Sequence, residues 1–468
     1  MTFCTRFRFV LAVLFLMVCG GCAFTPSKQT LQPFLDDVKQ LHAAGRSVTN
    51  LSDFSELSDE DFNLAAAILA VHKTVDPSID AMVYLEKVDW MAAELAYHLE
   101  NKTTDKAKVN VLTNFIWNKG FVSPDPFWKN YLQESYYEQW FLRYSSFTDM
   151  LDQKKGNCLS LSILYLVLAE RTGLPVYGVA IPEHLFVRYD SGTSIIHIEP
   201  TDNGTIYDEQ DYVRFDDKDY SSLPRTYYFT NLSRKEIFGC YLLNVGALYY
   251  MEKNYESALQ FYLLAHKCNP RDPAILQVLG NTYLKLRDYS KAMKAYKLGL
   301  QYNPDNARVY HSIGTIHSQF DRYDQALDAF SHAVSIDPLT AGYWNDKGLI
   351  LVRLERHEEA IEAYDKALEL DSKMAFIYCN KGISLYHLQN YHESRRMFDR
   401  ALELDPLDEN AWYCRARLAV QTDNIAEALS DLEKAKELNP EEVIWAAKRD
   451  PGFNSLAENP DFIRLVKP

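Results

Sequence analysis

The sequence lacks clustered positive charge and a disulfide framework, and each absence excludes a class of protein. Its 49 Lys and Arg are outnumbered by 64 Asp and Glu, which gives a net charge of −15. This deficit argues against a nucleic-acid partner and against electrostatic binding to anionic lipid, because both need an excess of cations. The eight cysteines are widely scattered, and five of them lie beyond the first 22 residues. An odd number so dispersed does not form a disulfide scaffold.

What the sequence does have is the composition of a globular chain. It contains 47% hydrophobic and 24% charged residues over 468 positions, enough for two or three domains. Its N-terminal apolar run, 9–18, is too short to span a bilayer comfortably. Arg6 and Arg8 precede this run and Cys19-Gly-Gly-Cys22 follows it, which is typical of a secretory signal that ends in small residues.

The N-terminal pattern resembles a bacterial lipoprotein signal. The resemblance implies a signal peptide at 1–21, lipidation of Cys22 after cleavage and a tether at 22–30. It therefore implies a lipid-anchored protein of the bacterial cell envelope, on the periplasmic side. Ala23 resembles the residues that permit sorting to an outer membrane, whereas Cys19 stands where leucine is commoner. An ordinary cleaved signal or an uncleaved anchor is the alternative.

Cys158 is the leading candidate nucleophile, because a glycine turn delivers it to the first position of a strongly apolar helix. The run is Lys154-Lys-Gly-Asn-Cys-Leu-Ser-Leu-Ser162, and the helix is predicted over 158–171. Asn157 is a natural N-cap, so Cys158 would stand at the positive end of the helix dipole, where a thiolate is stabilised. The Cys158 backbone N–H is a candidate oxyanion donor, with Gln153 as a weaker candidate for the second.

Strand-like runs follow this helix, and the last two form a predicted hairpin with the two-residue turn Ser191-Gly192. The runs are 176–181, 184–190 and 193–199. In that register His184 faces Glu199 across the hairpin. A carboxylate there would fix the imidazole tautomer and complete a cysteine, histidine and acid arrangement. A register slip of two residues would bring His197 opposite His184 instead.

These residues resemble the transglutaminase-like core domain over about residues 80–230. The likeness rests on Gly-Asn-Cys opening a helix, on Pro182-Glu-His-Leu-Phe-Val-Arg188 and on Ile198-Glu-Pro-Thr201. It implies a papain-like thiol fold with Cys158 as the nucleophile, His184 as the base and Glu199 as the third member, where relatives usually carry Asp. The family includes proteases, amidases, deamidating enzymes and acyl transferases, and some members lack the cysteine, so the substrate stays open.

Each of these residues also has a purely structural interpretation. In that interpretation Cys158 is a small core residue and Asn157 is only a helix cap. His197 is interpreted as a structural strand residue. Asp202 is the alternative third member of the triad, although its place beyond Pro200 favours a loop role.

The C-terminal half repeats with a period of 34 residues. Small residues recur at two places in each unit, a large apolar residue follows the second of them by four positions, and a proline lies near the end. Small residues let two helices approach closely, the aromatic fills the groove between them, and the proline ends the second helix. The recurring positions are Gly246, Gly280, Gly314, Gly348, Gly382 and Ala416; Ala258, Ala292, Ala326, Ala360, Ser394 and Ala428; Tyr262, Tyr296, Phe330, Tyr364, Phe398 and Leu432; and Pro270, Pro304, Pro338, Pro406 and Pro440, with Ser372 in the fifth place.

This periodicity indicates a tetratricopeptide array of six units at 239–440, followed by capping helices at 441–468. Such arrays present a concave groove that usually holds a peptide, so a protein or peptide ligand is the expected partner. A structural spacer is the alternative. Candidate groove residues are Asn244, Asn281, Asn345, Asn380 and Arg415.

The part of the chain that precedes Cys158 is expected to be helical and to pack around the core. Helices are predicted at 31–44, 59–72 behind a Ser58 cap, 78–100 and 104–119. Ten aromatic residues lie from Phe121 to Phe147. They would either line a substrate cleft or cover the core.

The expected fold class is α+β: a transglutaminase-like domain with helices and a small antiparallel sheet at 31–235, then an all-α tetratricopeptide superhelix. Two functions fit this organisation. One is a membrane-anchored thiol enzyme that hydrolyses or transfers an acyl group from an amide or ester, with the array recruiting its substrate. The other is a catalytically silent scaffold for protein assembly at the envelope. Neither function is expected to need a cofactor or a metal.

Overall fold

The structure is a computed structural model, and it describes residues 31–32, 51–123, 146–215 and 218–467. Several predictions concern residues outside these ranges. They are the signal peptide at 1–21, lipidation of Cys22, the tether at 22–30, most of the helix at 31–44 and most of the aromatic-rich stretch from Phe121 to Phe147.

The chain divides into two compact units. Residues up to Leu248 form the first unit together with 267–269, and residues 249–266 form the second together with the chain from Pro270 onward. The helices α10 (Arg234–Met251) and α11 (Tyr255–Cys268) contribute residues to both.

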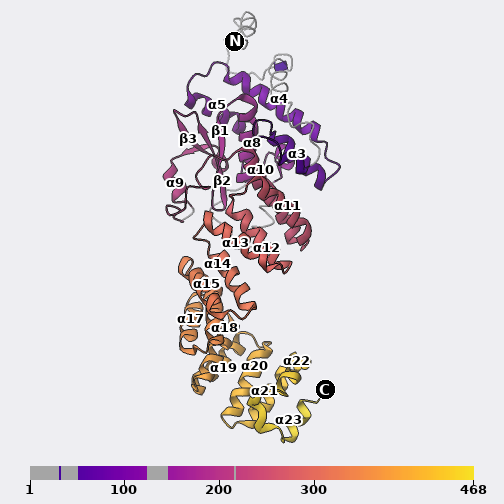
Figure 1. Cartoon of the computed structure of the whole chain (residues 1–468), viewed down its shortest axis with the longest axis vertical. Helices are drawn as coiled ribbons and strands as arrows, with labels where there is room; N and C mark the ends of the chain where they lie inside the picture. The colour runs from indigo at the N-terminus through magenta and orange to yellow at the C-terminus, as the bar shows by residue number, and fades with distance from the viewer. Residues whose placement is uncertain (1–30, 33–50, 124–145, 216–217, 468) are drawn as a thin grey trace, which may run out of the picture. The chain divides into compact units, whose positions relative to one another are not determined.

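A buried helix, α8 (Cys158–Thr172), is the centre of the first unit. Fourteen of its 15 residues are buried, and it packs against α4, β1 and β2 (Figure 1). The prediction of an interior helix that begins at Cys158 is therefore confirmed. Gly173 ends it in the left-handed conformation, which glycine adopts without the penalty of a Cβ. The helices that precede α8 are α2 (Leu51–Phe54), α3 (Leu64–Val75), α4 (Ala81–Leu99), α5 (Asp105–Asn118) and α7 (Phe147–Gln153).

The starts of these helices follow their capping side chains. α5 begins at Asp105 behind its cap Thr104, one residue after the predicted start, and α4 begins at Ala81 behind its cap Asp80, three residues after the predicted start at Ser78. The predicted start of a helix behind Ser58 is wrong, because α3 begins at Leu64 behind Asn63, whose side chain accepts from the Ala66 N–H. Ser58 instead bonds with Asp61 in a preceding turn.

In the described part of the first unit, four antiparallel strands form one sheet in the order β1-β2-β3-β4. They are β1 (Val176–Ile181), β2 (His184–Asp190), β3 (Ile195–Glu199) and β4 (Thr205–Tyr207). The predicted bounds of β1 and β2 are confirmed, β3 begins two residues later than predicted, and β4 was not predicted. Outside the named strands, Gly178 of β1 also pairs with Leu232.

The predicted register of the β2–β3 hairpin is wrong by two residues. Asp190 pairs with Ile195 instead of Thr193, so the turn contains four residues, Ser191–Ser194, and not two. The Asp190 side chain accepts from the Gly192 N–H at 3.0 Å, and the Ser191 N–H donates to the Ser194 carbonyl at 3.1 Å. These local hydrogen bonds stabilise the longer turn. The alternative slip, which would have paired His197 with His184, is also wrong because His197 pairs with Arg188.

The second unit consists of helices that pack in consecutive pairs: α12 with α13, α14 with α15, and so on to α20 with α21 (Figure 1). Their bounds are α12 (Pro273–Lys285), α13 (Tyr289–Tyr302), α14 (Ala307–Gln319), α15 (Tyr323–Ile336), α16 (Ala341–Arg353), α17 (His357–Leu370), α18 (Ala375–His387), α19 (Tyr391–Leu404), α20 (Glu409–Gln421) and α21 (Ile425–Leu438). The helical-pair repeat predicted from the 34-residue period is confirmed, including the end of α17 at Leu370 despite the missing proline.

The repeated glycines face the repeated aromatics, as the sequence pattern predicts. A Cβ added at Gly348 would lie 2.5 Å from the Tyr364 ring, and one added at Gly280 would lie 2.3 Å from the Tyr296 ring. Gly314 and Gly382 meet phenylalanine rings in the same way. The four pairs from α12–α13 to α18–α19 therefore each close on an aromatic ring that leaves no room for a Cβ, whereas α20–α21 has Ala416 and Leu432 at these positions.

Short helices cover the apolar end of the last pair. They are α22 (Pro440–Ala447), the 3-10 helix Pro451–Leu456 and α23 (Pro460–Leu465). Phe453, Leu456 and Phe462 are buried in one cluster with Leu432 of α21. These short helices lie where the sequence predicts a C-terminal cap at 441–468.

Candidate active site

A capping box fixes the N-terminus of α8 and makes Cys158 its first residue. The Asn157 side chain accepts from the Leu159 and Ser160 N–H groups at 3.1 and 3.0 Å, and the Ser160 hydroxyl accepts from the Asn157 N–H at 3.0 Å. A Cβ at Gly156 would lie 2.5 Å from that hydroxyl. The Gly-Asn-Cys sequence thus places the thiol at the positive end of the helix.

The side chains of His184 and Glu199 are in direct contact. His184 Nε2 lies 2.8 Å from Glu199 Oε2, and the two side chains are 2% and 0% exposed. The observed register, extended by one pair, puts Glu199 opposite Phe186, so it reaches His184 diagonally on the same face of the sheet. The expected contact therefore forms although the predicted register is wrong.

Cys158 faces the same imidazole ring. Its side chain lies close enough to help raise the pKa of His184, and only 3% of Cys158 is exposed. Since Nε2 contacts Glu199, Nδ1 is the ring nitrogen available to the thiol. The structure thus brings together the three residues that sequence reasoning proposed as a triad.

Glu199 is held by four hydrogen-bond donors. Its Oε1 accepts from the Thr201 N–H at 3.0 Å and from the Thr201 hydroxyl. Its Oε2 accepts from Tyr212 at 3.2 Å and contacts His184. A carboxylate can accept about four such bonds, so the charge of Glu199 is fully solvated by protein groups.

The electrostatics of the pair favour its charged form. Burial opposes protonation of His184, but the Glu199 carboxylate and the Cys158 side chain outweigh this effect and raise the pKa of His184 to about 10. Burial likewise tends to raise the pKa of Glu199, yet His184 and Thr201 lower it below its ordinary value. An imidazolium and a carboxylate therefore coexist at neutral pH.

Two aromatic residues of the segment after β4 cover this pair, and sequence reasoning missed both. The Phe215 ring stacks on His184 at 4.8 Å between centroids. Tyr212 lies in α9 (Glu209–Val213) and stacks on Phe186 at 3.7 Å. No spacing pattern connects them to the triad, although Thr201 was visible in the Glu-Pro-Thr motif.

The alternative residues have other roles. Asp202 accepts a hydrogen bond from Tyr207 at 2.9 Å, which separates its carboxylate from the Glu199 position. His197 is buried against the rings of Phe186 and Tyr212, as expected of a structural strand residue. Gln153 ends α7 with an exposed side chain, and no measured contact joins it to Cys158.

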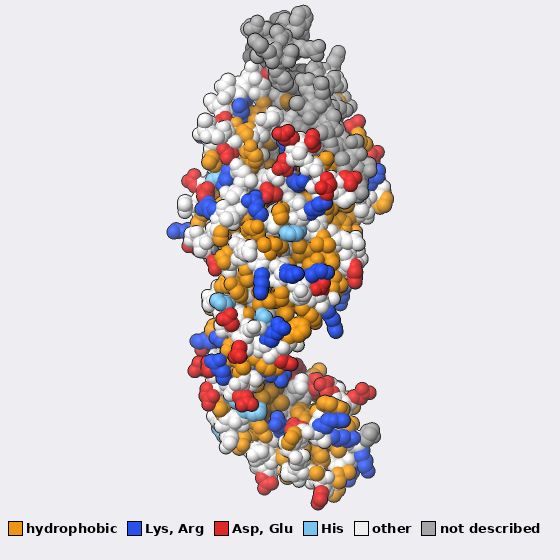
Figure 2. Space-filling view, in the orientation of Figure 1, with side chains coloured by type: hydrophobic (Ala, Val, Ile, Leu, Met, Phe, Trp, Pro, Cys, Tyr) orange, Lys and Arg blue, Asp and Glu red, His pale blue; other side chains and the backbone are white. Residues whose placement is uncertain are grey.

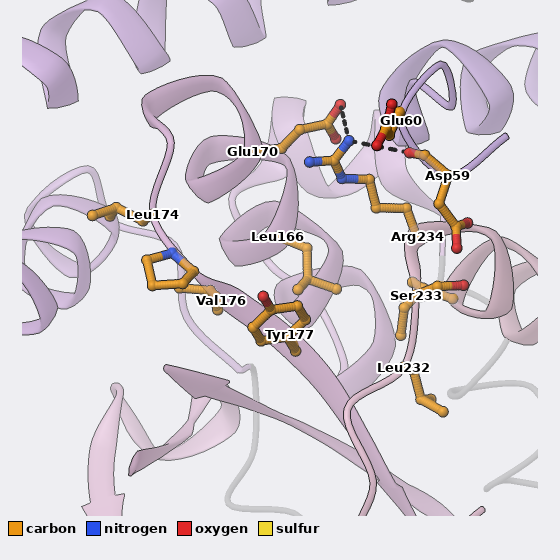
Figure 3. Close-up of a pocket in the computed structure, with 12 residues that line it drawn as sticks. Asp59, Glu60, Leu166, Glu170, Leu174, Val176, Tyr177, Leu232, Ser233 and Arg234 are labelled. Carbon is orange, nitrogen blue, oxygen red and sulfur yellow. Dashed lines mark hydrogen bonds and ion pairs between the residues drawn. The ribbon is translucent and has the colours of Figure 1, made fainter. Parts of the chain in front are cut away.

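A cavity of about 320 Å³ lies at the opposite end of α8 (Figure 3). Its wall is apolar at Leu166 and acidic at Glu170, which follows Cys158 by twelve residues, about 18 Å along the helix. Arg234 reaches across it, 3.7 Å from Glu170 Oε1 and 3.5 Å from the Asp59 carbonyl. This cavity is therefore separate from the cysteine.

The predicted groove residues of the second unit make contacts with their neighbours. Asn380 donates to Asn345 at 3.1 Å, and Asn345 donates to Asp346 at 3.0 Å. Asn281 accepts from Tyr296, and Arg415 forms ion pairs with two aspartates. Asn244 lies in α10 and is partly buried.

The described residues contain neither a candidate membrane span nor a candidate metal cluster. No helix there is both long and apolar enough to cross a membrane. Within the same ranges, no group of three or more His, Cys, Asp or Glu side chains is arranged to hold a metal ion.

Family models match both parts of the chain. The model of the transglutaminase-like superfamily matches residues 83–239. A second model, described as the cilia and flagella-associated protein 70 C-terminal domain, matches residues 239–450.

Individual proteins are similar at low identity. UPF0162 proteins of two Xylella fastidiosa strains are 22% identical over 160 residues, which is 34% of this chain and 53% of theirs. The chain thus spans about half the length of these relatives. Among solved structures, Pseudomonas aeruginosa pilF is 20% identical over 43% of this chain and 92% of its own, with a TM-score of 0.39. YrrB, described as a TPR protein with an unusual peptide-binding site, is 22% identical over 40% of this chain and 98% of its own, with a TM-score of 0.36.

The match at 83–239 covers the cysteine, the histidine and the glutamate, and the helix pairs with their 34-residue period follow it. The chain therefore carries a transglutaminase-like domain at residues 83–239, followed by a TPR-like helical array.

Proposed function

We propose that the protein is a thiol enzyme of the cell envelope that acts on an amide or ester, and that its helical array recruits the substrate or a partner protein. The observation that carries the proposal is the buried imidazole of His184, which contacts Glu199 and whose pKa both Glu199 and the nearby Cys158 raise. Structural cysteines have no need of such a neighbour, whereas a nucleophilic thiol requires one.

In the proposed reaction the Cys158 thiol has already given its proton to His184, and the thiolate of this ion pair attacks the carbonyl carbon of the substrate. A tetrahedral oxyanion forms, and the Cys158 backbone N–H at the start of α8 is positioned to stabilise it. As the carbon–nitrogen or carbon–oxygen bond breaks, His184 returns the proton to the leaving group. Water or an amine then attacks the thioester and regenerates the thiol.

Glu199 has a supporting role in this scheme. It contacts the imidazole nitrogen opposite the one that serves the thiol, so it fixes the ring orientation and stabilises the imidazolium. Its own ionisation is secured by the Thr201 and Tyr212 hydrogen bonds.

For the array we propose a peptide ligand. A row of hydrogen-bonded polar side chains crosses α14, α16 and α18, which are the first helices of three successive pairs. The row runs from His311 through Asp346 and Asn345 to Asn380. Amide and carboxylate groups in such a row can exchange their mutual bonds for bonds with the backbone of an extended chain.

The alternative is a catalytically silent scaffold, and one observation favours it: Cys158 is only 3% exposed. A substrate carbonyl would need access that this conformation does not give. The reactivity of the Cys158 thiol distinguishes the enzyme from the silent scaffold.

Peptide-resolved alkylation by iodoacetamide at pH 7 tests the enzymatic proposal. We expect His184→Ala and Glu199→Ala to slow modification of Cys158 on the order of tenfold or more, because the paired imidazolium is lost. Asp202→Ala should leave the rate near that of the wild type. Cys268 is the internal control, since it is a buried thiol whose pKa burial raises to about 11. Equal rates for Cys158 in the wild type and in His184→Ala would leave the scaffold as the better explanation.

A further inference from the structure

Tyr212 occupies an unusual position relative to the candidate triad. Its hydroxyl donates to Glu199 Oε2, the same oxygen that contacts His184 Nε2. Tyrosine and imidazole therefore share one carboxylate oxygen, while both bonds from Thr201 go to the other oxygen.

Contacts with neighbouring rings fix the orientation of the Tyr212 side chain, so its hydroxyl points at Glu199 Oε2. It lies parallel to the Phe186 ring, with 3.7 Å between centroids and 9° between planes, and edge-on to the Tyr207 ring at 5.8 Å. Burial and the Glu199 charge raise the pKa of Tyr212, so its phenol keeps its proton and remains a donor. The position of the Tyr212 hydroxyl therefore depends on the packing of α9 against β2 and β4.

We propose that Tyr212 is a positioning residue for the reaction proposed above, setting the ionisation of Glu199 and through it the orientation and charge of His184. The inference rests on the proposed function, and it adds a residue that the cysteine, histidine and acid pattern does not contain.

The physical effect has a definite sign. A hydrogen bond to the charged form of an acid lowers its pKa. Without the Tyr212 donor, Glu199 should hold its proton to higher pH, and protonated Glu199 no longer stabilises the imidazolium. Bonds to charged groups are worth enough to shift an acid by on the order of one pH unit.

Nuclear magnetic resonance of the His184 ring in the full chain tests this proposal, because the acid-side inflection of its resonances reports ionisation of Glu199. In Tyr212→Phe we expect the inflection to move up by about one pH unit, with the ring stack on Phe186 preserved. Tyr207→Phe is the matched control, since it deletes a tyrosine hydroxyl bound to the neighbouring carboxylate of Asp202. It should leave the inflection unchanged.

A second substitution keeps the test valid if Tyr212→Phe does not fold. A 3-fluorotyrosine at position 212 is a stronger donor of nearly the same shape, so the inflection should move down. If Tyr212 had a purely structural role, the inflection would not move up in Tyr212→Phe and down in the 3-fluorotyrosine variant. Unchanged inflections in both variants, or the same shift in Tyr207→Phe, would overturn the proposal.

Separate measurements test the proposed function and the role of Tyr212. Alkylation of Cys158 in the same samples reports the enzymatic proposal, whereas the His184 titration reports Tyr212. An unreactive Cys158 with the expected titration shifts would remove the enzyme and leave Tyr212 as the residue that controls Glu199. A reactive Cys158 with no titration shift would remove only the role of Tyr212.

Discussion

His184 and Glu199 form a buried charged pair whose contribution to stability depends on pH. The pKa of His184 rises from 6.5 to about 10 on folding, so the folded state keeps a proton that the unfolded state loses. Its contribution is fully present below about pH 6.5 and is lost as the pH rises through about 10. Glu199 has a lowered pKa, so its contribution is present above about pH 4.5 and is lost as the pH falls through the folded value.

We predict that the extra stability of the wild type over His184→Gln declines between about pH 6.5 and about pH 10, by up to about 1.4 kcal/mol per pH unit. Urea unfolding at several pH values measures this difference. A difference that stays constant over this window would show that His184 is neutral in the folded protein.

At the same scale, sequence reasoning found Cys158, His184 and Glu199 but not Tyr212 or Phe215. The first three belong to local patterns: a capped helix start and the ends of two strands. The other two reach the site from the segment after β4, and their place depends on how α9 packs on the sheet. Packing between segments has no periodicity that a sequence displays.

At the scale of elements, the helix pairs of the array depend on glycines that face aromatic rings. In α16, a Cβ added at Gly348 would clash with the Tyr364 ring, whereas a Cβ added at Gly342 would have no atom within 4 Å. One helix thus offers a test position and its own control.

We predict that Gly348→Ala destabilises the protein by about 1–3 kcal/mol, because the rigid ring must shift. Gly342→Ala should be neutral or stabilising by up to about 1 kcal/mol, since alanine favours the helix. Chemical denaturation of the two variants measures the contrast. Equal effects would mean that the ring moves freely and that glycine is not required there.

The hairpin shows the limit of prediction for elements. The strand bounds of β1 and β2 followed from residue types, but the β2–β3 register did not, because it depends on the turn. Asp190 and Asp105 hold Ser191 and Gly192 in a four-residue turn through side-chain hydrogen bonds. The pattern Ser-Gly alone suggested a shorter one.

At the scale of the whole molecule, the composition explains how the surface is built. Figure 2 shows acidic and basic side chains interspersed over the viewed face, and many form pairs one turn apart, such as Arg356 with Glu359. Exposed pairs of this kind contribute little to stability.

We predict that the mature chain begins at a lipidated Cys22. Mass spectrometry of its N-terminal peptide should show the added acyl mass, and Cys22→Ala should move the protein from the membrane to the soluble fraction. An unmodified Cys22 would remove the lipid anchor from the proposed function.

The start of α8, the runs that form β1 and β2, and the period of the array follow from the amino-acid sequence alone. These features depend on capping side chains, on the residue types of short runs and on a fixed period, which act over a few residues or recur at equal spacing. Only the tertiary structure decided the hairpin register, the four donors on Glu199 and the aromatic cover on His184. They are contacts between segments far apart in the chain, and their geometry follows from turn length and packing.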